Sequence, residues 1–80
     1  MNKKKNFQLI AIGEKIRELR KEKNYSQEQF AIITGLDRSY YGAVERGERN
    51  ISSLNLIKIA LALNEEVGEL FPSINQLKKM

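Results

Sequence analysis

The feature that most constrains the fold is the stretch SQEQFAIITGLDRSYYGAVERG, residues 26–47, where two short helical patterns flank a glycine. Ser26 followed by Gln29 fits a capping box, which marks the start of a helix. Gly35 stands where the end of that helix needs a positive φ. Asp37 is a good N-cap for a second helix, which is expected to run to about residue 46. These signals predict two helices joined by a turn of three or four residues.

Apolar residues at intervals of three and four predict further helices on both sides of this stretch. One helix is expected over residues 7–23, another after Ser52 or Ser53, a shorter one over residues 65–71, and a final turn or two over residues 73–79. The side chains expected to face inward are Leu9, Ile12, Ile16 and Leu19 in the first helix, Phe30, Ala31, Ile33 and Thr34 in the second, and Leu54, Ile57, Leu61 and Leu63 in the fourth. No stretch alternates with a period of two, so the fold class is all-α.

Composition limits the chemistry that the chain can perform. Eighty residues form one domain (1–80) with a small core and little room for a deep catalytic cavity. The absence of cysteine and histidine removes thiolate metal sites, the commonest metal ligand and the commonest general base. No pair of carboxylates lies in an apolar setting. We therefore expect neither an enzyme nor a protein with a metal, cofactor or small-molecule ligand.

Charge points instead to a polyanionic partner. The chain has 14 Lys+Arg against 10 Asp+Glu, a net charge of +4, and the excess lies in residues 1–23. Lys3, Lys4 and Lys5 form either a basic tail or an arm that contacts phosphate. The apolar run FQLIAI that follows is too short for a signal peptide, and no stretch approaches the ~20 apolar residues of a membrane span. A cytoplasmic protein without a membrane partner is expected.

The helix expected over residues 37–46 has two unlike faces. One face carries Tyr41, Val44 and Glu45, and the other carries Arg38, Ser39, Gly42, Ala43 and Arg46 within an arc of about 140°. The second face is low, with hydrogen-bond donors at its rim, and this shape suits the major groove of DNA. Alternatively, Gly42 makes room for a neighbouring helix. Spacing alone also allows an ordinary corner between two helices instead of a helix-turn-helix.

A family resemblance is carried by QEQFAIITGLDRSYYGAVERGERN, which resembles the helix-turn-helix of the lambda-repressor/Cro family, the XRE-type DNA-binding domain. The matching residues are Gln27, Ala31, Gly35, Leu36, Val44 and Glu45-Arg46-Gly47, and the similarity extends through NISSLNLIKIALALN to ELF at residues 69–71. The resemblance implies a compact five-helix bundle, with the helix-turn-helix at about residues 27–46. It also implies a homodimer that binds double-stranded DNA at a near-palindromic operator.

The resemblance also implies roles for individual residues. Arg38 and Ser39 would reach base edges, and Ala43 would lie against the groove floor. The residues expected to contact the sugar–phosphate backbone are Gln27, Tyr40, Arg46, Arg49 and Asn50. Arg38 could instead form a surface ion pair, and Asn50 could cap the turn before the next helix. Arg20 and Glu45 match a structural ion pair. Tyr41 departs from the family, which usually has Ile, Val or Leu there, so its orientation is open.

Near the C-terminus an apolar set is expected either to form the dimer interface or to fold back on the first helix. Its members, in a segment of about residues 65–79, are Val67, Leu70, Phe71, Ile74 and Leu77. The chain further resembles the controller proteins of bacterial restriction–modification systems, which activate and then repress their own gene and the endonuclease gene. That role adds RNA polymerase as a partner. An antitoxin or other protein-interaction module and a phage Cro-like repressor are the alternatives.

Overall fold

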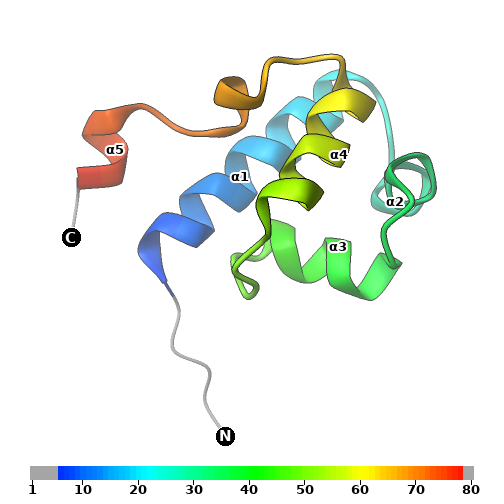
Figure 1. Cartoon of the computed structure of the whole chain (residues 1–80), viewed down its shortest axis with the longest axis horizontal. Coiled ribbons are helices and arrows are strands. Elements are labelled where there is room, and N and C mark those ends of the chain that lie inside the picture. Colours follow the sequence, from blue (N-terminus) through cyan, green and yellow to red (C-terminus); the bar gives the residue numbers. More distant parts are fainter. Residues whose placement is uncertain (1–5, 79–80) are drawn as a thin grey trace, which may run out of the picture.

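The computed structural model describes residues 6–78, which form five α-helices, one 3₁₀ turn and no strand. The helices are α1 (Phe7–Glu22), α2 (Gln27–Thr34), α3 (Arg38–Glu45), α4 (Ser53–Leu63) and α5 (Ile74–Lys78), and the 3₁₀ turn η1 (Val67–Leu70) lies between the last two. α1 is the longest, and α3, η1 and α5 all pack against it (Figure 1). The all-α class and the five-helix bundle are confirmed. The predicted residues Lys3–Lys5 and residue 79 lie outside the described part of the chain.

Side-chain caps explain where the first four helices begin. Asn6, Ser26, Asp37 and Ser52 each accept a hydrogen bond from the backbone N–H three residues further on. At Ser26 the capping box is complete, because the Gln29 side chain also accepts from the Ser26 N–H. Each such cap contributes about 0.5–2 kcal/mol. Of these four, Asn6 is the one that the sequence analysis did not identify.

The hydrophobic core lies where α1, α2, α3 and α4 meet, and η1 closes one end of it. Phe30 is at its centre, with its ring 5.4 Å from that of Tyr41 in an edge-on arrangement and 5.6 Å from that of Tyr25. The other fully or nearly fully buried apolar residues include Ile16, Ala31, Val44, Ile59, Ala60, Leu63 and Leu70. No helix formed by residues 6–78 is long and apolar enough to cross a membrane.

α1 and α3 approach each other closely at Gly13. A Cβ atom at this position would lie 2.4 Å from the backbone oxygen of Glu45 and 2.5 Å from that of Val44. Only glycine fits there without moving backbone. This contact holds the C-terminal end of α3 against α1 and so helps to fix the orientation of α3 relative to α1.

The face that α4 buries differs from the prediction. Leu63 and Ala60 point inward as expected, but Leu54, Ile57 and Leu61 are exposed, Leu54 by 73% and Leu61 by 76%. Ile59, which was not among the predicted residues, is fully buried beside Ala60 and Leu63. The sequence SLNLIKIALAL has apolar residues on nearly every side, so two stripes with the same spacing were possible. The prediction chose the wrong one.

Three smaller predictions also differ from the structure. Ile33 was expected to face inward but is 48% exposed, whereas Thr34 is buried and donates its hydroxyl to the Ala31 carbonyl at 2.9 Å. The helix expected over residues 65–71 is only the short 3₁₀ turn Val67–Leu70. Leu70, predicted for a dimer interface, has no exposed surface because η1 inserts it into the monomer core. Val67, Phe71 and Ile74 remain exposed, and Leu77 is partly buried.

Candidate nucleic-acid interface

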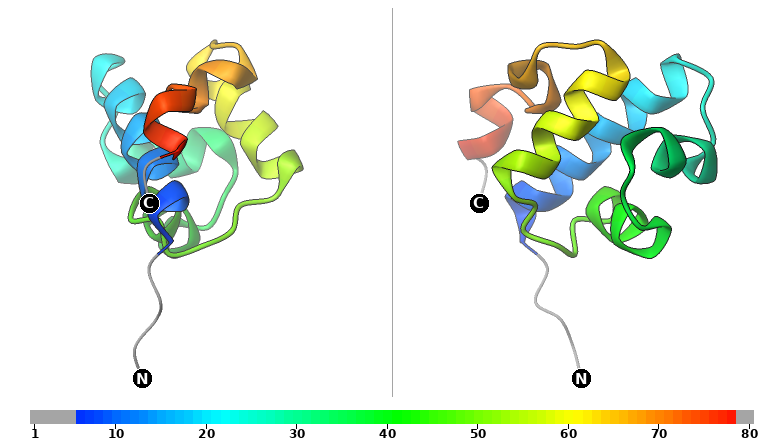
Figure 2. Two further views of the ribbon diagram at one scale, coloured as in Figure 1. Left: turned by 90° about the vertical axis from the view of Figure 1, so that its left-hand side faces the viewer. Right: turned by 45° about the vertical axis from the view of Figure 1, so that its right-hand side comes forward.

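The turn between α2 and α3 has the geometry that a helix-turn-helix requires. Gly35 ends α2 with φ of 77°, and the next residue, Leu36, turns back to donate its N–H to the Ala31 carbonyl at 3.2 Å. Leu36 itself packs against the core. Asp37 then caps α3 by accepting from the Tyr40 N–H at 3.0 Å. Figure 2 shows the result, with α2 and α3 adjacent and α3 along one edge of the molecule.

A buried polar network anchors the C-terminal end of α3. Glu45, whose side chain is 2% exposed, accepts two hydrogen bonds from the Arg20 guanidinium, from Nε at 2.6 Å and from Nη2 at 3.1 Å. The Tyr41 hydroxyl also donates to Glu45. Arg20 donates a third time, to the Tyr25 carbonyl at 2.7 Å. The predicted ion pair is therefore present, and Tyr41 points inward, with a partner for its hydroxyl.

These contacts shift the pKa values of the groups in the network. Burial alone would raise the pKa of the Glu45 carboxyl, but hydrogen bonds from Arg20, Gln27 and Tyr41 more than offset burial and lower it. Burial and the hydrogen bond to Glu45 raise the pKa of the Tyr41 hydroxyl well above its ordinary value. Hydrogen bonding to Glu45 likewise raises the pKa of Arg20. At neutral pH the network is therefore an ion pair with a neutral tyrosine.

The network extends to one of the predicted DNA contacts. Gln27, the first residue of α2, donates from Nε2 to Glu45 at 3.0 Å. One of its two amide N–H groups is thereby used, and the other is left for a ligand. Glu45 thus fixes the side chain of Gln27 beside α3.

The expectation of a bare, low face on α3 is corrected by the structure. Gly42 is buried, and a Cβ atom there would meet two side-chain ends, Arg46 Nη1 at 3.2 Å and Gln27 Oε1 at 3.5 Å. Its small size therefore accommodates polar side chains rather than a neighbouring helix. Ala43 is only 8% exposed, so little of its methyl group is available for the predicted contact with a groove floor. The first turn of α3, rather than its middle, is what the protein presents outward.

Arg38 and Ser39 occupy this first turn and are both exposed. Arg38 takes part in none of the ion pairs found among residues 6–78, and Asp37 is turned toward the backbone of α3. The surface ion pair considered for Arg38 is therefore not present in this part of the chain. Both side chains are therefore open to solvent.

Arg46, Arg49 and Asn50 are exposed around the end of α3. Arg46 pairs with Glu48 through Nε at 3.1 Å. The guanidinium of Arg49 lies over the ring of Tyr40, 4.9 Å from its centroid. The N-cap of α4 is Ser52, whose side chain accepts from the Asn55 N–H. Cations thus lie at the C-terminal end of α3 as well as at its start.

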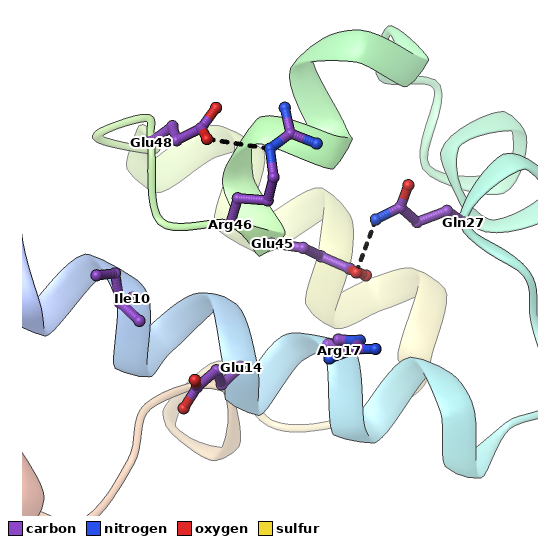
Figure 3. Close-up of a pocket in the computed structure, with 7 residues that line it drawn as sticks. All are labelled: Ile10, Glu14, Arg17, Gln27, Glu45, Arg46 and Glu48. Carbon is purple, nitrogen blue, oxygen red and sulfur yellow. Dashed lines mark hydrogen bonds and ion pairs between the residues drawn. The ribbon is translucent and has the colours of Figure 1, made fainter. Parts of the chain in front are cut away.

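A polar cleft lies between α1 and the end of α3 (Figure 3). It is lined by Ile10, Glu14, Arg17, Gln27, Glu45, Arg46 and Glu48. Figure 3 shows Gln27 at the start of α2 and Arg46 at the end of α3, each bonded to a carboxylate, and Arg17 on α1. No group of three or more His, Cys, Asp or Glu that could hold a metal occurs in the described range. The cleft is a charged recess beside α3, and Arg17 adds a cation to it.

One contact was missed from the sequence, and one group of residues was assigned to the wrong place. Asn55 on α4 donates from Nδ2 to the Tyr40 hydroxyl at 3.1 Å, across 15 positions of sequence. No local pattern marks such a contact. The exposed apolar side chains of α4 were identified but assigned to the core.

The helices α2 and α3 and the sharp turn between them define a helix-turn-helix domain. Comparison with known proteins agrees. The model of the family described as "Helix-turn-helix" matches residues 16–70, so the chain belongs to that family. Control protein C.MunI from Mycoplasma sp is 47% identical over 68 residues, which cover 84% of this chain and 92% of that protein.

Solved structures are similar in both fold and sequence. The restriction–modification controller protein C.AhdI from Aeromonas hydrophila superposes with a TM-score of 0.77 and 54% identity, over 79% of this chain and 96% of that one. SinR, a master regulator of biofilm formation solved in complex with DNA, has a TM-score of 0.71 and 37% identity, over 74% and 95% of the two chains.

Proposed function

We propose that this protein is a sequence-specific DNA-binding transcriptional regulator and, within that class, the controller of a restriction–modification system. The observation that carries the proposal is the first turn of α3, where Arg38 and Ser39 point outward with no partner in the described part of the chain. An arginine can bind guanine O6 and N7 with two hydrogen bonds, which is the commonest specific contact in the major groove. The controller role is supported by the similarity to C.MunI and C.AhdI.

The residues around α3 suit contacts with the DNA backbone. Gln27 keeps one amide N–H for a phosphate, and Arg46 and Arg49 lie at the other end of α3. Phosphate contacts position the protein, whereas base contacts select the sequence. Because such contacts release counterions, binding should weaken steeply as salt increases.

The test is to select duplexes from a randomised pool with the wild-type protein and to measure affinity for the enriched sequence by gel shift. Arg38→Ala should cost about 1–3 kcal/mol and relax the preference at one base position. Arg49→Ala is the matched control. It should weaken binding to all sequences alike and reduce the salt slope by about one. If Arg38→Ala also weakens all sequences equally, Arg38 contacts only phosphate.

Failure of the wild type to enrich any sequence would refute the DNA-reading role and favour a protein-interaction module such as an antitoxin. The genes that flank this one also distinguish a restriction–modification controller from an antitoxin. A methyltransferase and an endonuclease support the controller, and a toxin supports the antitoxin. A controller that activates transcription would act in the cytoplasm and contact RNA polymerase.

We also propose a homodimer, formed through the α4 apolar face, which we define as Leu54, Ile57, Leu61 and the adjacent Val67. Ile57, Leu61 and Val67 line one groove. Leu61 is 76% exposed, and burying such a side chain contributes about 1.5–3 kcal/mol. A contiguous apolar face of this kind usually marks an interface. A two-fold dimer would place two α3 helices about 34 Å apart on a near-palindromic operator.

The interface is tested by Leu61→Glu, which should give monomers in sedimentation equilibrium and weaken operator binding. Ile74→Glu, at an equally exposed apolar position on α5, is the matched control. Dissociation by Leu61→Glu alone assigns the interface to α4. Dissociation by Ile74→Glu alone assigns it to the C-terminal segment and refutes the α4 face.

A further inference from the structure

Asn55 is held in a defined orientation at the start of α4. Its backbone N–H donates to the Oγ of Ser52 at 3.1 Å, as part of the helix cap. Its side-chain Nδ2 donates to the hydroxyl of Tyr40 on α3, also at 3.1 Å. Asn55 is partly buried. The N-terminal cap of α4 thus holds Asn55 where its side-chain amide N–H points at Tyr40 on α3.

This hydrogen bond determines what the Tyr40 hydroxyl can still do. A phenol has one hydrogen to donate and also accepts hydrogen bonds. Because its oxygen accepts from Asn55, the hydrogen remains available, and within residues 6–78 the hydroxyl donates to no acceptor. The exposed Arg49 lies over the ring at 4.9 Å and adds a positive charge beside it. A donor next to a cation suits an anionic acceptor.

We propose that Asn55 is a positioning residue for DNA binding, which orients the Tyr40 hydroxyl to donate to a phosphate oxygen of the operator. This inference rests on the proposed function. Asn55 acts through Tyr40 and need not touch DNA itself. Fixing the ring before binding reduces the entropy that must be lost when the complex forms.

The experiment compares Asn55→Ala and Asn55→Asp in wild-type and Tyr40→Phe backgrounds, with a duplex selected by the wild-type protein from a randomised pool. Asn55→Ala should weaken binding about 3- to 10-fold, the effect of leaving one side chain mobile. Asn55→Asp should weaken it more, because a carboxylate would accept the phenol hydrogen that the phosphate needs. In the Tyr40→Phe background, Asn55→Ala should have no further effect. Asn75→Asp on α5 is the control for added negative charge.

A purely structural role, or a direct contact of Asn55 with DNA, would give the same loss in both backgrounds and would overturn the inference. A second readout needs neither DNA nor an Asn55 variant. The side-chain amide NMR signals of Asn55 should shift when Tyr40 is replaced by phenylalanine, and unchanged signals would refute the contact. If the proposed function itself is wrong, the wild-type protein will enrich no duplex at all. That outcome differs from a failure of the Asn55 inference alone, in which the wild type still selects a duplex.

Discussion

The substitution Glu45→Gln tests the buried network that holds α3 in place. It preserves the shape of the side chain but removes its charge, so Arg20, whose side chain is 8% exposed, loses its counterion. The amide group that replaces one oxygen would face the donors of that oxygen, which are Arg20 Nη2 and Gln27 Nε2 at Oε1, or Arg20 Nε and the Tyr41 hydroxyl at Oε2. Removing one partner of a buried ion pair costs about 3–5 kcal/mol. A domain of this size has a total stability of only about 4–12 kcal/mol.

The free energy of unfolding is measured by urea titration at pH 7, together with the melting temperature. The latter should fall by about 4–8 °C for each kcal/mol lost. The matched control is Glu65→Gln, which removes the same charge from the exposed pair with Lys23, 3.8 Å apart. It should cost at most about 1 kcal/mol. If Glu45→Gln costs no more than Glu65→Gln, water reaches the network in solution. The claim that burial makes this ion pair costly to break is then refuted.

The cost should also depend on pH. Because the pKa of Glu45 is lowered in the folded protein, the unfolded chain takes up the proton more readily. Stability from this carboxylate is therefore fully present above the ordinary value of 4.5 and is lost as the pH falls through the folded pKa below it. The difference between wild type and Glu45→Gln should be constant above about pH 5 and shrink in acid. A difference that grows as the pH falls would contradict this assignment.

Further predictions follow from single contacts. Gly13→Ala should cost about 1–3 kcal/mol or more in urea titrations, since its Cβ would meet backbone, whereas Gly68→Ala, with nothing within 4 Å, should be neutral or stabilising. Tyr41→Phe should cost about 1.5–3 kcal/mol at pH 7. Above pH 10 this cost should shrink, because the tyrosine ionises in the unfolded chain while burial keeps it neutral in the folded one. Ser26→Ala should lower the free energy of unfolding by the contribution of one cap, about 0.5–2 kcal/mol, and so lower the melting temperature. Equal melting of this variant and wild type would show that the cap contributes nothing.

The two helices of the helix-turn-helix and the turn between them could be predicted because their signals are local. The capping box at Ser26, the glycine at Gly35 and the cap at Asp37 each act within four residues, and the structure has all three. The family resemblance supplied the Arg20–Glu45 pair, which spans 25 positions and which spacing alone would not reveal. The DNA contacts all remain predictions, and Ala43 has little exposed surface with which to make its own.

The sequence by itself therefore determined the first four helices, the caps at Ser26, Asp37 and Ser52, and the sharp turn before α3, because each depends on residues within one helical turn. Only the tertiary structure decided which side of α4 is buried, because that helix is apolar nearly all round and both stripes could have been chosen. The same holds for Leu70, which entered the core, and for Tyr40, which found its partner on another helix. Burial and long-range hydrogen bonds depend on how helices meet, and no local spacing encodes that geometry.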